Sequence, residues 1–269
     1  MDVSFCTTCK NRLHQLKETL PRNLRDCRGA EGSVEFVLVD FGSTDGVLDW
    51  VVDHHGDALR SGLLKLFTTR GLPQFHASIA KNTAHRLGSG RILTNLDVDN
   101  FVGPGGGRYV ARVLQRGERK AVFHQWSGVW GDGTYGRISC AREAFHGIGG
   151  YDEAFHPAGY QDTDILERLR VGLGLELVKE EANPVTRRIF RALWGRPTSP
   201  RHSRAIPNEK ADTIADHEGG AARWSEWETE NRARSEANLA AGRFVMNPGG
   251  MGVREEILQW VDGGFEPVP

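Results

Sequence analysis

Apolar residues in the first hundred positions form short runs rich in β-branched side chains, separated by longer stretches with helical spacing. Runs of this length and composition are typical of buried strands. They lie at residues 3–8, 34–39, 63–68 and 91–96. The stretches between them predict helices at residues 11–25, from about residue 47, and at 77–87. Strands and helices that alternate in this way predict an α/β fold with a mostly parallel central sheet flanked by helices.

The pattern changes after the glycine-rich residues 103–107. Apolar spacing beyond them predicts strands at 121–126 and 138–141 and helical segments at 109–114, 143–146 and 161–171. An aromatic, turn-rich loop at 130–136 separates the two strands and is a candidate ligand-binding segment.

The last third of the chain has weaker periodicity. Residues 183–208 are rich in Arg and Pro, which is typical of a long lid over a site or of a disordered segment. Residues 221–241 predict a charged helix, whose weak apolar face favours a solvated position over a homodimer contact or a membrane-surface element. We therefore expect one domain at 1–210, made of halves at 1–102 and 103–210, followed by a helical C-terminal extension at 211–269.

The overall charge is nearly balanced, since 34 basic residues stand against 35 acidic ones for a formal net charge of -1. Such a balance gives no general attraction to nucleic acid or to an anionic membrane. No apolar run approaches the roughly 20 residues that cross a bilayer, and the N-terminus lacks the basic and apolar segments of a secretion signal. We expect a cytoplasmic protein that has no transmembrane segment and does not bind nucleic acid.

The four cysteines are too few for a disulfide scaffold in a chain of 269 residues. Cys6 and Cys9 form a CxxC without a second pair to complete a zinc site, and positions three apart in a strand point to opposite faces. We interpret the cysteines as small apolar residues near the core, with a redox role as the alternative.

Asp97 and Asp99 directly follow the fourth predicted strand. Ligands of open α/β sheets bind at the carboxyl ends of the strands, so both carboxylates fall where a ligand is expected. Two such carboxylates suit Mg²⁺ or Mn²⁺, which in turn can bridge the phosphates of a nucleotide and stabilise charge on a diphosphate leaving group. Because Asp is also a common turn residue, the structural alternative is a plain turn.

Asp40 and Asp45 bracket a turn after the second predicted strand. Asp40 either accepts a hydrogen bond from a base or ribose or closes the turn. Asp45 precedes an apolar helix, and a role as its N-cap explains this residue without a ligand.

Several short segments of the chain occur in the same order as similar segments in one group of enzymes. The first half of the chain has VDFGSTDG at 39–46, AKN at 80–82 and LDVD at 96–99. These segments resemble the nucleotide-binding half of family 2 glycosyltransferases with the GT-A fold. The second half has GRISC at 136–140, GGYDE at 149–153, GYQDTD at 159–164, HSR at 202–204 and NE at 208–209. These are similar to segments of β-1,4-galactosyltransferases and related polymerising enzymes.

The resemblance implies a glycosyltransferase that binds a nucleotide-sugar, with UDP as the family's common carrier. Residues 1–102 would be its nucleotide-binding half, and residues 103–210 its acceptor and catalytic half with the lid. Asp97 and Asp99 would belong to the metal and diphosphate site, and His202 would return from the lid as a further ligand of Mn²⁺ or Mg²⁺. Lys81 either faces the diphosphate or lies solvated on a helix surface. The donor-binding residues implied in this way are Thr8, Lys10, Arg12, Asp40, Asn82, Asp97, Val98 and Asp99.

Asp162 occupies the position of the family's catalytic base, at a helix start where the helix dipole favours a carboxylate. The resemblance implies that this base takes the proton of an acceptor hydroxyl and that transfer inverts the anomeric configuration. An N-cap is again the structural alternative, and Gln161 stands where the family usually has glutamate. The acceptor would be a carbohydrate, a glycolipid or a small molecule. Its predicted contacts are Trp130, whose ring either binds the apolar face of a sugar or packs in the protein, and Gly150, Gln161 and Asp164. For Asp164 a positioning or structural role is the alternative.

Other functions use similar residues. A nucleotidyltransferase acting on sugar phosphates typically has a glycine-rich, basic loop after its first strand, where this chain has CTTCK at 6–10. A glycosidase uses paired carboxylates but needs no nucleotide-binding turn. A non-catalytic sugar-nucleotide-binding protein is the remaining alternative, for which Gln161 is the only indication.

Overall fold

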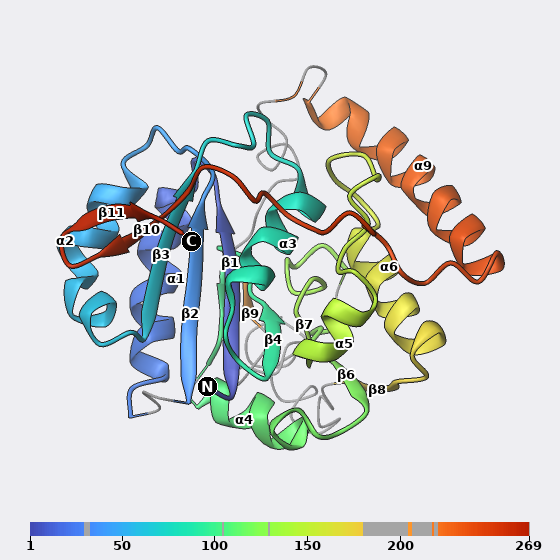
Figure 1. The fold of residues 1–269 in the computed structure, drawn as a ribbon, viewed down its shortest axis with the longest axis horizontal. Helices are drawn as coiled ribbons and strands as arrows, with labels where there is room; N and C mark the ends of the chain where they lie inside the picture. The colour runs from blue at the N-terminus through green and yellow to red at the C-terminus, as the bar shows by residue number, and fades with distance from the viewer. Residues whose placement is uncertain are drawn as a thin grey trace, which may run out of the picture.

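The structure is a computed structural model that describes residues 1–29, 33–103, 105–128, 130–179, 204–205, 217 and 220–268. Within these residues a nine-stranded sheet has the strand order β11-β10-β3-β2-β1-β4-β7-β6-β8 (Figure 1). Its strands are β1 (Val3–Cys9), β2 (Val34–Asp40), β3 (Leu64–Thr69), β4 (Ile92–Asn95), β6 (Ala121–His124), β7 (Ile138–Ala141), β8 (Glu176–Lys179), β10 (Ile257–Val261) and β11 (Gly264–Pro267). A second, short pair joins β5 (Asn100–Phe101) to β9 (Arg204–Ala205).

The centre of the sheet is parallel, as predicted. Strands β3, β2, β1 and β4 are neighbours with parallel pairing throughout. Towards the edges the sheet is mixed, because β10 pairs antiparallel with β3, and β7 pairs antiparallel with β4. Since the parallel strands end at the same edge, the segments that follow β1, β2 and β4 come together there.

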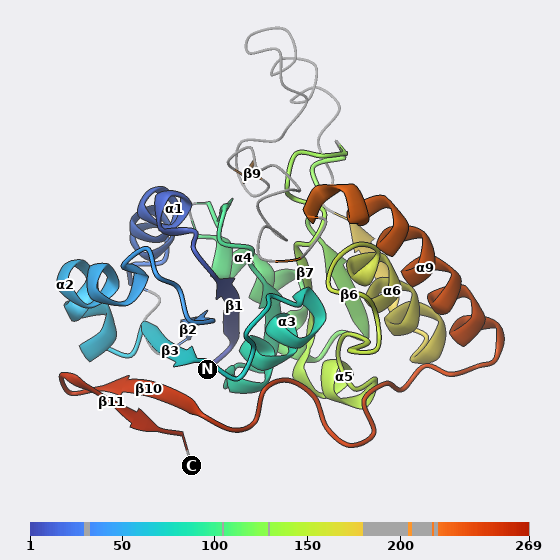
Figure 2. The same ribbon diagram turned by 90° about the horizontal axis from the view of Figure 1, so that it is seen from above.

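Helices cover both faces of the sheet (Figure 2). On one face α1 (Leu13–Asp26), α2 (Val47–Arg60) and α4 (Gly106–Val113) contribute to one apolar cluster. On the other face α3 (Ala77–Leu87), α5 (Arg142–Gly147) and α6 (Gln161–Glu167) contribute to a second. In the part of the chain that the structure describes, no helix is long and apolar enough to cross a membrane.

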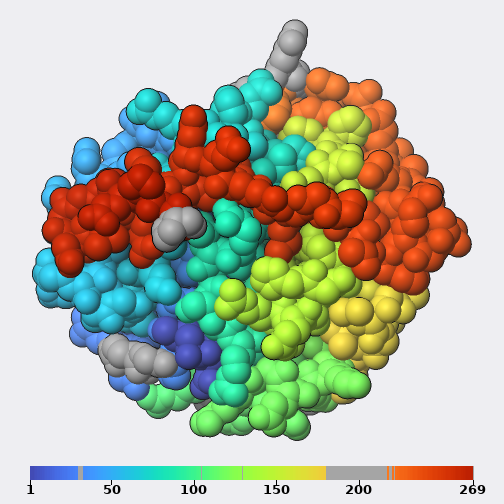
Figure 3. Space-filling view, in the orientation of Figure 1, coloured from blue at the N-terminus to red at the C-terminus, as the bar shows by residue number. Residues whose placement is uncertain are grey.

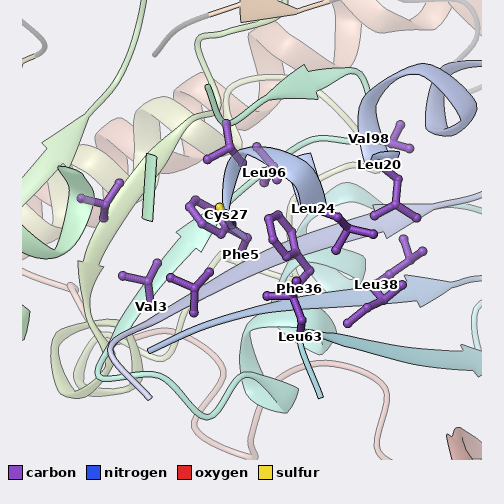
Figure 4. Close-up of a cluster of buried hydrophobic side chains, with 14 of the residues drawn as sticks. Val3, Phe5, Leu20, Leu24, Cys27, Phe36, Leu38, Leu63, Leu96 and Val98 are labelled. Atoms are coloured by element: carbon purple, nitrogen blue, oxygen red, sulfur yellow. The ribbon is translucent and has the colours of Figure 1, made fainter. Parts of the chain in front are cut away.

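Successive residues of β1 point to opposite faces and so join different apolar clusters. Phe5 belongs to the cluster under α1, where it stacks on Phe36 with ring centroids 5.1 Å apart (Figure 4). Cys6 belongs to the cluster under α3. Each fully buried side chain of this size stabilises the fold by about 1.5–3 kcal/mol, so the sheet is held from both sides.

All four cysteines are buried and free of disulfides. Cys6 and Cys9 lie in different apolar clusters, on opposite faces of the sheet. Burial raises the pKa of the Cys27 thiol to about 11 and that of Cys140 to about 12. Thiols this weakly acidic are poor nucleophiles, so the interpretation of the cysteines as apolar core residues is confirmed.

The C-terminal segment differs from the predicted helical extension. It is helical over α9 (Gly220–Ala240), close to the predicted 221–241. Residues 241–256 then cross the molecule to the far edge of the sheet, where β10 and β11 form a hairpin beside β3 (Figures 1 and 3). The turn of this hairpin is Asp262-Gly263, and both residues have positive φ. An Asp-Gly pair flanked by apolar residues is a strong hairpin signal, and the helical interpretation of this segment was wrong because it passed over that signal.

Candidate active site

The predicted carboxylates meet a lysine at the carboxyl end of β4. Lys81, from the middle of α3, donates a hydrogen bond from Nζ to Oδ1 of Asp162 at 2.8 Å. The same Nζ lies 3.5 Å from Oδ1 of Asp97. Asp97 follows β4 and Asp162 lies in the first turn of α6, so three elements distant in the sequence supply these side chains. We refer to Asp97, Lys81 and Asp162 as the Asp-Lys-Asp cluster.

Gly136 packs directly against this cluster. A Cβ atom at Gly136 would lie 2.8 Å from Oδ2 of Asp97, 3.0 Å from Oδ2 of Asp162 and 3.2 Å from Nζ of Lys81. Such distances leave no room for a side chain without moving the charged groups. The glycine that opens the GRISC segment therefore lets the backbone close one side of the Asp-Lys-Asp cluster.

The Lys81 and Asp162 side chains are only 7% and 15% exposed, whereas that of Asp97 is 30% exposed. Burial raises the pKa of Asp162; the Lys81 ammonium opposes this shift, and the Asp97 carboxylate adds to it. For Lys81, burial favours the neutral amine, but the two carboxylates outweigh burial and raise its pKa. Two acids thus share one ammonium, which keeps Lys81 protonated.

Asp99 is only 3% exposed and accepts a hydrogen bond from Nδ2 of Asn100 at 2.7 Å. Burial, and next the Asp97 carboxylate, raise the pKa of Asp99 to about 6, while Arg12 lowers it. A buried carboxylate beside a second carboxylate is stabilised by a cation, and oxygen donors suit Mg²⁺ or Mn²⁺. Asp97 and Asp99 therefore fit the predicted metal.

One of the three predicted metal ligands lies outside the described residues. His202, the predicted third ligand, is outside the described residues. Among the described residues, no group of three or more His, Cys, Asp and Glu side chains is arranged to hold a metal. The assignment of His202 therefore stays a prediction.

The loops after β1 and β2 are tied together beside this edge. Ser43 Oγ accepts a hydrogen bond from the Asn11 amide, and Asn11 Oδ1 accepts one from the Thr44 amide, each at 2.8 Å. Asp45 Oδ2 accepts from the Leu13 amide at 2.8 Å. The expectation that Asp45 is the N-cap of α2 was wrong, because that position is Gly46, and Asp45 instead accepts from the first amide of α1.

Asp40 is fully buried and closes the turn after β2. Its carboxylate accepts hydrogen bonds from the amides of Gly42 and Ser43 and from the Thr68 hydroxyl. Burial raises its pKa. These contacts favour the turn-closing alternative, and the predicted contact of Asp40 with a base or ribose remains untested.

The other predicted donor-binding residues lie around the same edge. Arg12 is buried, hydrogen-bonds Gln15 at 2.9 Å and lies near enough to Asp99 to affect its pKa. Lys10 hydrogen-bonds the Pro73 carbonyl. Thr8 is a buried residue of β1, and Val98 is buried with its carbonyl bonded to the Thr19 hydroxyl at 2.6 Å.

Asn82 and Gly150 face each other inside the protein. Asn82 is fully buried, and its amide group bonds both the N–H and the carbonyl of Tyr151, at 2.8 and 2.9 Å. Gly150 has φ +67°, and a Cβ there would lie 2.3 Å from Asn82 Oδ1. These contacts favour a structural role for both residues, and the predicted contacts of Asn82 with the donor and of Gly150 with the acceptor remain untested.

Asp164 has the contacts of a structural residue, and its predicted contact with the acceptor remains untested. Its side chain and that of Arg168 are completely inaccessible, and they form a salt bridge of 2.7 Å. Ser235 of α9 donates to the other Asp164 oxygen at 2.8 Å. Arg168 in turn bonds the Gly150 carbonyl at 2.8 Å. Asp164, the second acid of the DTD sequence, therefore fixes α6 in place, whereas the first, Asp162, is part of the Asp-Lys-Asp cluster.

α9 packs against the segment that leads to Asp162, contrary to the expected solvated position. Its buried face consists of Trp227, Asn231, Ser235 and Asn238. Asn231 Nδ2 bonds the carbonyls of Ala158 and Gly159 at 3.1 and 2.8 Å. Most of this face is polar, so a search for apolar periodicity does not find it.

An aromatic group lies beside the first turn of α6. Trp130 is 71% exposed and stacks on Tyr135 with ring centroids 4.7 Å apart, and Trp126 lies 4.9 Å from Trp130. The Tyr135 hydroxyl is 3.1 Å from the Thr163 hydroxyl, next to Asp162. Gln161 Oε1 is buried and has no hydrogen-bond partner among the described residues. Both predicted residues, Trp130 and Gln161, therefore remain candidates for acceptor contact.

No protein-family model and no curated protein matches the sequence. Solved structures do resemble this chain. Staphylococcus aureus TarS 1–349 in complex with UDP superposes with a TM-score of 0.56 at 14% identity, covering 88% of this chain and 72% of that chain. The mannosyltransferase PcManGT from Pyrobaculum calidifontis, in complex with GDP-Man and Mn²⁺, gives 0.51 at 16% identity over 89% and 74% of the two chains.

The chain has the GT-A fold. A further TarS 1–349 structure gives a TM-score of 0.54 at 15% identity, and there the alignment spans 68% of this chain but only 59% of that chain, less than two thirds of its length. The predicted GT-A fold is confirmed. The predicted division into a family 2-like first half and a galactosyltransferase-like second half stays a prediction, as does the domain boundary near residue 210.

Proposed function

We propose that the protein is a metal-dependent, inverting glycosyltransferase that transfers a hexose or N-acetylhexosamine from a UDP-sugar to an acceptor hydroxyl. The convergence of Asp97, Asp99 and Asp162 at the carboxyl end of β4 in a GT-A fold carries this proposal. The neighbouring TarS structures contain UDP and UDP-GlcNAc, and PcManGT contains GDP-Man and Mn²⁺. These ligands support a nucleotide-sugar donor.

Asp162 is the proposed general base. As the acceptor oxygen bonds to the anomeric carbon, its proton passes to the Asp162 carboxylate, and the bond between sugar and diphosphate breaks with its electron pair on the phosphate oxygen. The raised pKa of Asp162 makes it a stronger proton acceptor than an exposed aspartate. Displacement in one step inverts the anomeric carbon and forms no covalent intermediate with the enzyme.

Asp97 and Asp99, with His202, are the proposed metal ligands. When bound, Mn²⁺ or Mg²⁺ would offset the negative charge that grows on the diphosphate. Arg12 adds positive charge on the same side of the site, as its effect on Asp99 indicates. Thr8, Lys10 and Val98 are proposed to line the donor site from the loops around it.

Trp130 and Gln161 are the proposed acceptor contacts. An exposed indole can stack on the apolar face of a sugar ring, and the unpartnered Gln161 Oε1 can accept a hydrogen bond from a sugar hydroxyl. The acceptor class is a carbohydrate, a glycolipid or a small molecule.

UDP release from a panel of UDP-hexoses and UDP-N-acetylhexosamines, with Mn²⁺ and mixed saccharide acceptors, tests this function. We expect release from at least one α-linked donor and a β-linked product by NMR. A newly formed α linkage would rule out inversion, and no release from any donor would contradict the proposed reaction.

A further inference from the structure

Lys81 is buried at the centre of the Asp-Lys-Asp cluster, although the reaction above gives it no role. We propose that Lys81 is a positioning residue: it orients the Asp162 carboxylate and fixes Asp162 relative to Asp97, and it does not itself bind the donor diphosphate. This inference rests on the proposed function of Asp162 as the base.

The backbone that carries Lys81 is held firmly. Nearly all of α3 from Ala77 to His85 is buried, and the Ala77 amide bonds the Pro157 carbonyl at 2.8 Å. The next residue, Asn82, clamps the backbone of Tyr151 from both sides. The ammonium also lies over the Tyr151 ring, with Nζ 5.5 Å from its centroid. The backbone of Lys81 is therefore fixed relative to the segment that leads to α6.

The ammonium itself is already paired. The Lys81 side chain is 7% exposed, and its Nζ is shared between Asp162 Oδ1 at 2.8 Å and Asp97 Oδ1 at 3.5 Å. Gly136 closes a further side, where a Cβ would lie 3.2 Å from Nζ. A buried cation that serves two carboxylates has little left to offer a diphosphate, which distinguishes Lys81 from a phosphate-binding lysine.

The Lys81 ammonium fixes the orientation of the Asp162 carboxylate. An aspartate on its own rotates about two side-chain bonds, whereas a carboxylate whose Oδ1 is held by a fixed ammonium has one preferred direction. The Tyr151 side chain also hydrogen-bonds this carboxylate, but Lys81 adds the charged contact that fixes Oδ1. A displacement of about 1 Å in a reacting group can cost roughly 100-fold in rate, so a base without this contact would be a poorer one. Lys81 therefore affects the chemical step and not the binding of the donor.

Lys81→Met tests this assignment, with Lys65→Met as the matched control. Lys65 also pairs with a buried carboxylate, Glu35, at 2.6 Å, but it lies near the amino end of β3, away from the site. For Lys81→Met we expect kcat for UDP release to fall about 100-fold, with the Kd for UDP in Mn²⁺ unchanged within about threefold, because a lost ammonium does not weaken binding of a metal cation. Lys65→Met should lower stability without lowering kcat, and Lys81→Arg, which keeps the charge, should recover part of the lost kcat.

Two results would overturn the assignment. An unchanged kcat in Lys81→Met would show that Asp162 does not need the lysine, and a Kd for UDP raised tenfold or more would show that Lys81 binds the donor. The interaction between Lys81 and Asp162 can also be measured without catalytic turnover. Urea denaturation of Lys81→Met, Asp162→Asn and the double variant gives the loss of stability in each. We expect the double variant to lose less stability than the sum of the losses in the two single variants. Additive losses of stability would contradict the pairing of Lys81 with Asp162. Absence of UDP release by the unmodified protein would instead count against the proposed function, and the urea comparison would still decide the pairing.

Discussion

Lys81 Nζ and Asp162 Oδ1 lie 2.8 Å apart, although the two residues are 81 positions apart in the sequence. The pair joins the middle of α3 to the first turn of α6, and it sets Asp162 beside Asp97 at the carboxyl end of β4. The N-cap of α6 is Tyr160, so Asp162, the second residue of the helix, does not have that role. This arrangement distinguishes Asp162 from the structural alternative and leads to the first prediction.

Asp162→Asn should lower kcat by about 10²–10⁴-fold, because an amide of the same shape cannot accept the acceptor's proton. Binding of UDP should change by less than about threefold, since Asp162 is not a proposed donor contact. The measurement is initial-rate kinetics of UDP release together with a UDP titration. Glu167→Gln, on the same helix and paired with Arg170 near the surface, is the control that keeps full activity. A kcat for Asp162→Asn close to that of this control would remove Asp162 as the base.

Arg168→Leu should lower the free energy of unfolding by about 3–5 kcal/mol, because it leaves the buried Asp164 carboxylate without its cation and frees the Gly150 carbonyl. Urea denaturation measures this loss. Arg170→Leu removes a neighbouring arginine whose salt bridge with Glu167 is partly exposed, and it should cost less than about 1 kcal/mol. Similar losses in the two variants would contradict a structural role for the Asp164–Arg168 pair.

Gly150→Ala should be far more destabilising than Gly174→Ala. Both glycines have φ near +65°, but nothing lies within 4 Å of a Cβ at Gly174, whereas one at Gly150 would meet Asn82 Oδ1 at 2.3 Å and Met251 Sδ at 2.7 Å. We expect a loss of about 1–2 kcal/mol for Gly174→Ala, from backbone conformation alone, and more than about 3 kcal/mol for Gly150→Ala. Thermal or urea unfolding of the two variants separates the cost of conformation from that of space, and equal losses would show that the packing at Gly150 relaxes easily.

His85 should make the fold sensitive to acid. Its ring is buried, stacks on Phe145 at 4.5 Å and bonds the Lys81 carbonyl through Nδ1 at 2.7 Å. Burial lowers its pKa from 6.5 to about 4, so between these values the unfolded chain binds the proton and the folded chain does not. The contribution of this histidine is complete above pH 6.5 and should fall by about 3 kcal/mol as the pH drops to about 4.

The free energy of unfolding of the unmodified protein and of His85→Gln, measured between pH 4 and 7, isolates this effect. The variant should lose less stability towards acid, because its side chain does not titrate. Parallel pH profiles for the two proteins would show that His85 does not take up a proton on unfolding in this range.

The parts of the fold that the sequence predicts are those with apolar spacing. Helix α3 lies at the predicted residues 77–87, and Asp97 follows the predicted fourth strand, since β-branched runs and helical periodicity report burial directly. The buried face of α9 was missed because Asn231, Ser235 and Asn238 bury polar groups through hydrogen bonds, which leave no apolar pattern. The C-terminal hairpin has a local signal, Asp262-Gly263, which the prediction of a helical extension did not use.

The candidate site also contains residues that the sequence predicts and residues that it does not. Position at a strand end singled out Asp97 and Asp99, because topology alone decides where such residues lie. Which of two nearby acids faces the site depends on contacts between distant segments: Asp164 is taken by Arg168 and Ser235, and Asp162 by Lys81. Lys81 itself could not be separated from a surface lysine, because its burial depends on α6 and on Gly136, which pack against it only in the folded protein.

The most direct test of the proposed donor site is a calorimetric titration of UDP with Mn²⁺ and with chelator, for the unmodified protein and for Asp99→Asn. We predict that binding occurs with Mn²⁺, is lost with chelator, and is weakened about tenfold or more by Asp99→Asn, since that carboxylate is a proposed metal ligand. Binding of equal strength with chelator and in the variant, or no binding of UDP at all, would contradict a metal and diphosphate site at Asp97 and Asp99.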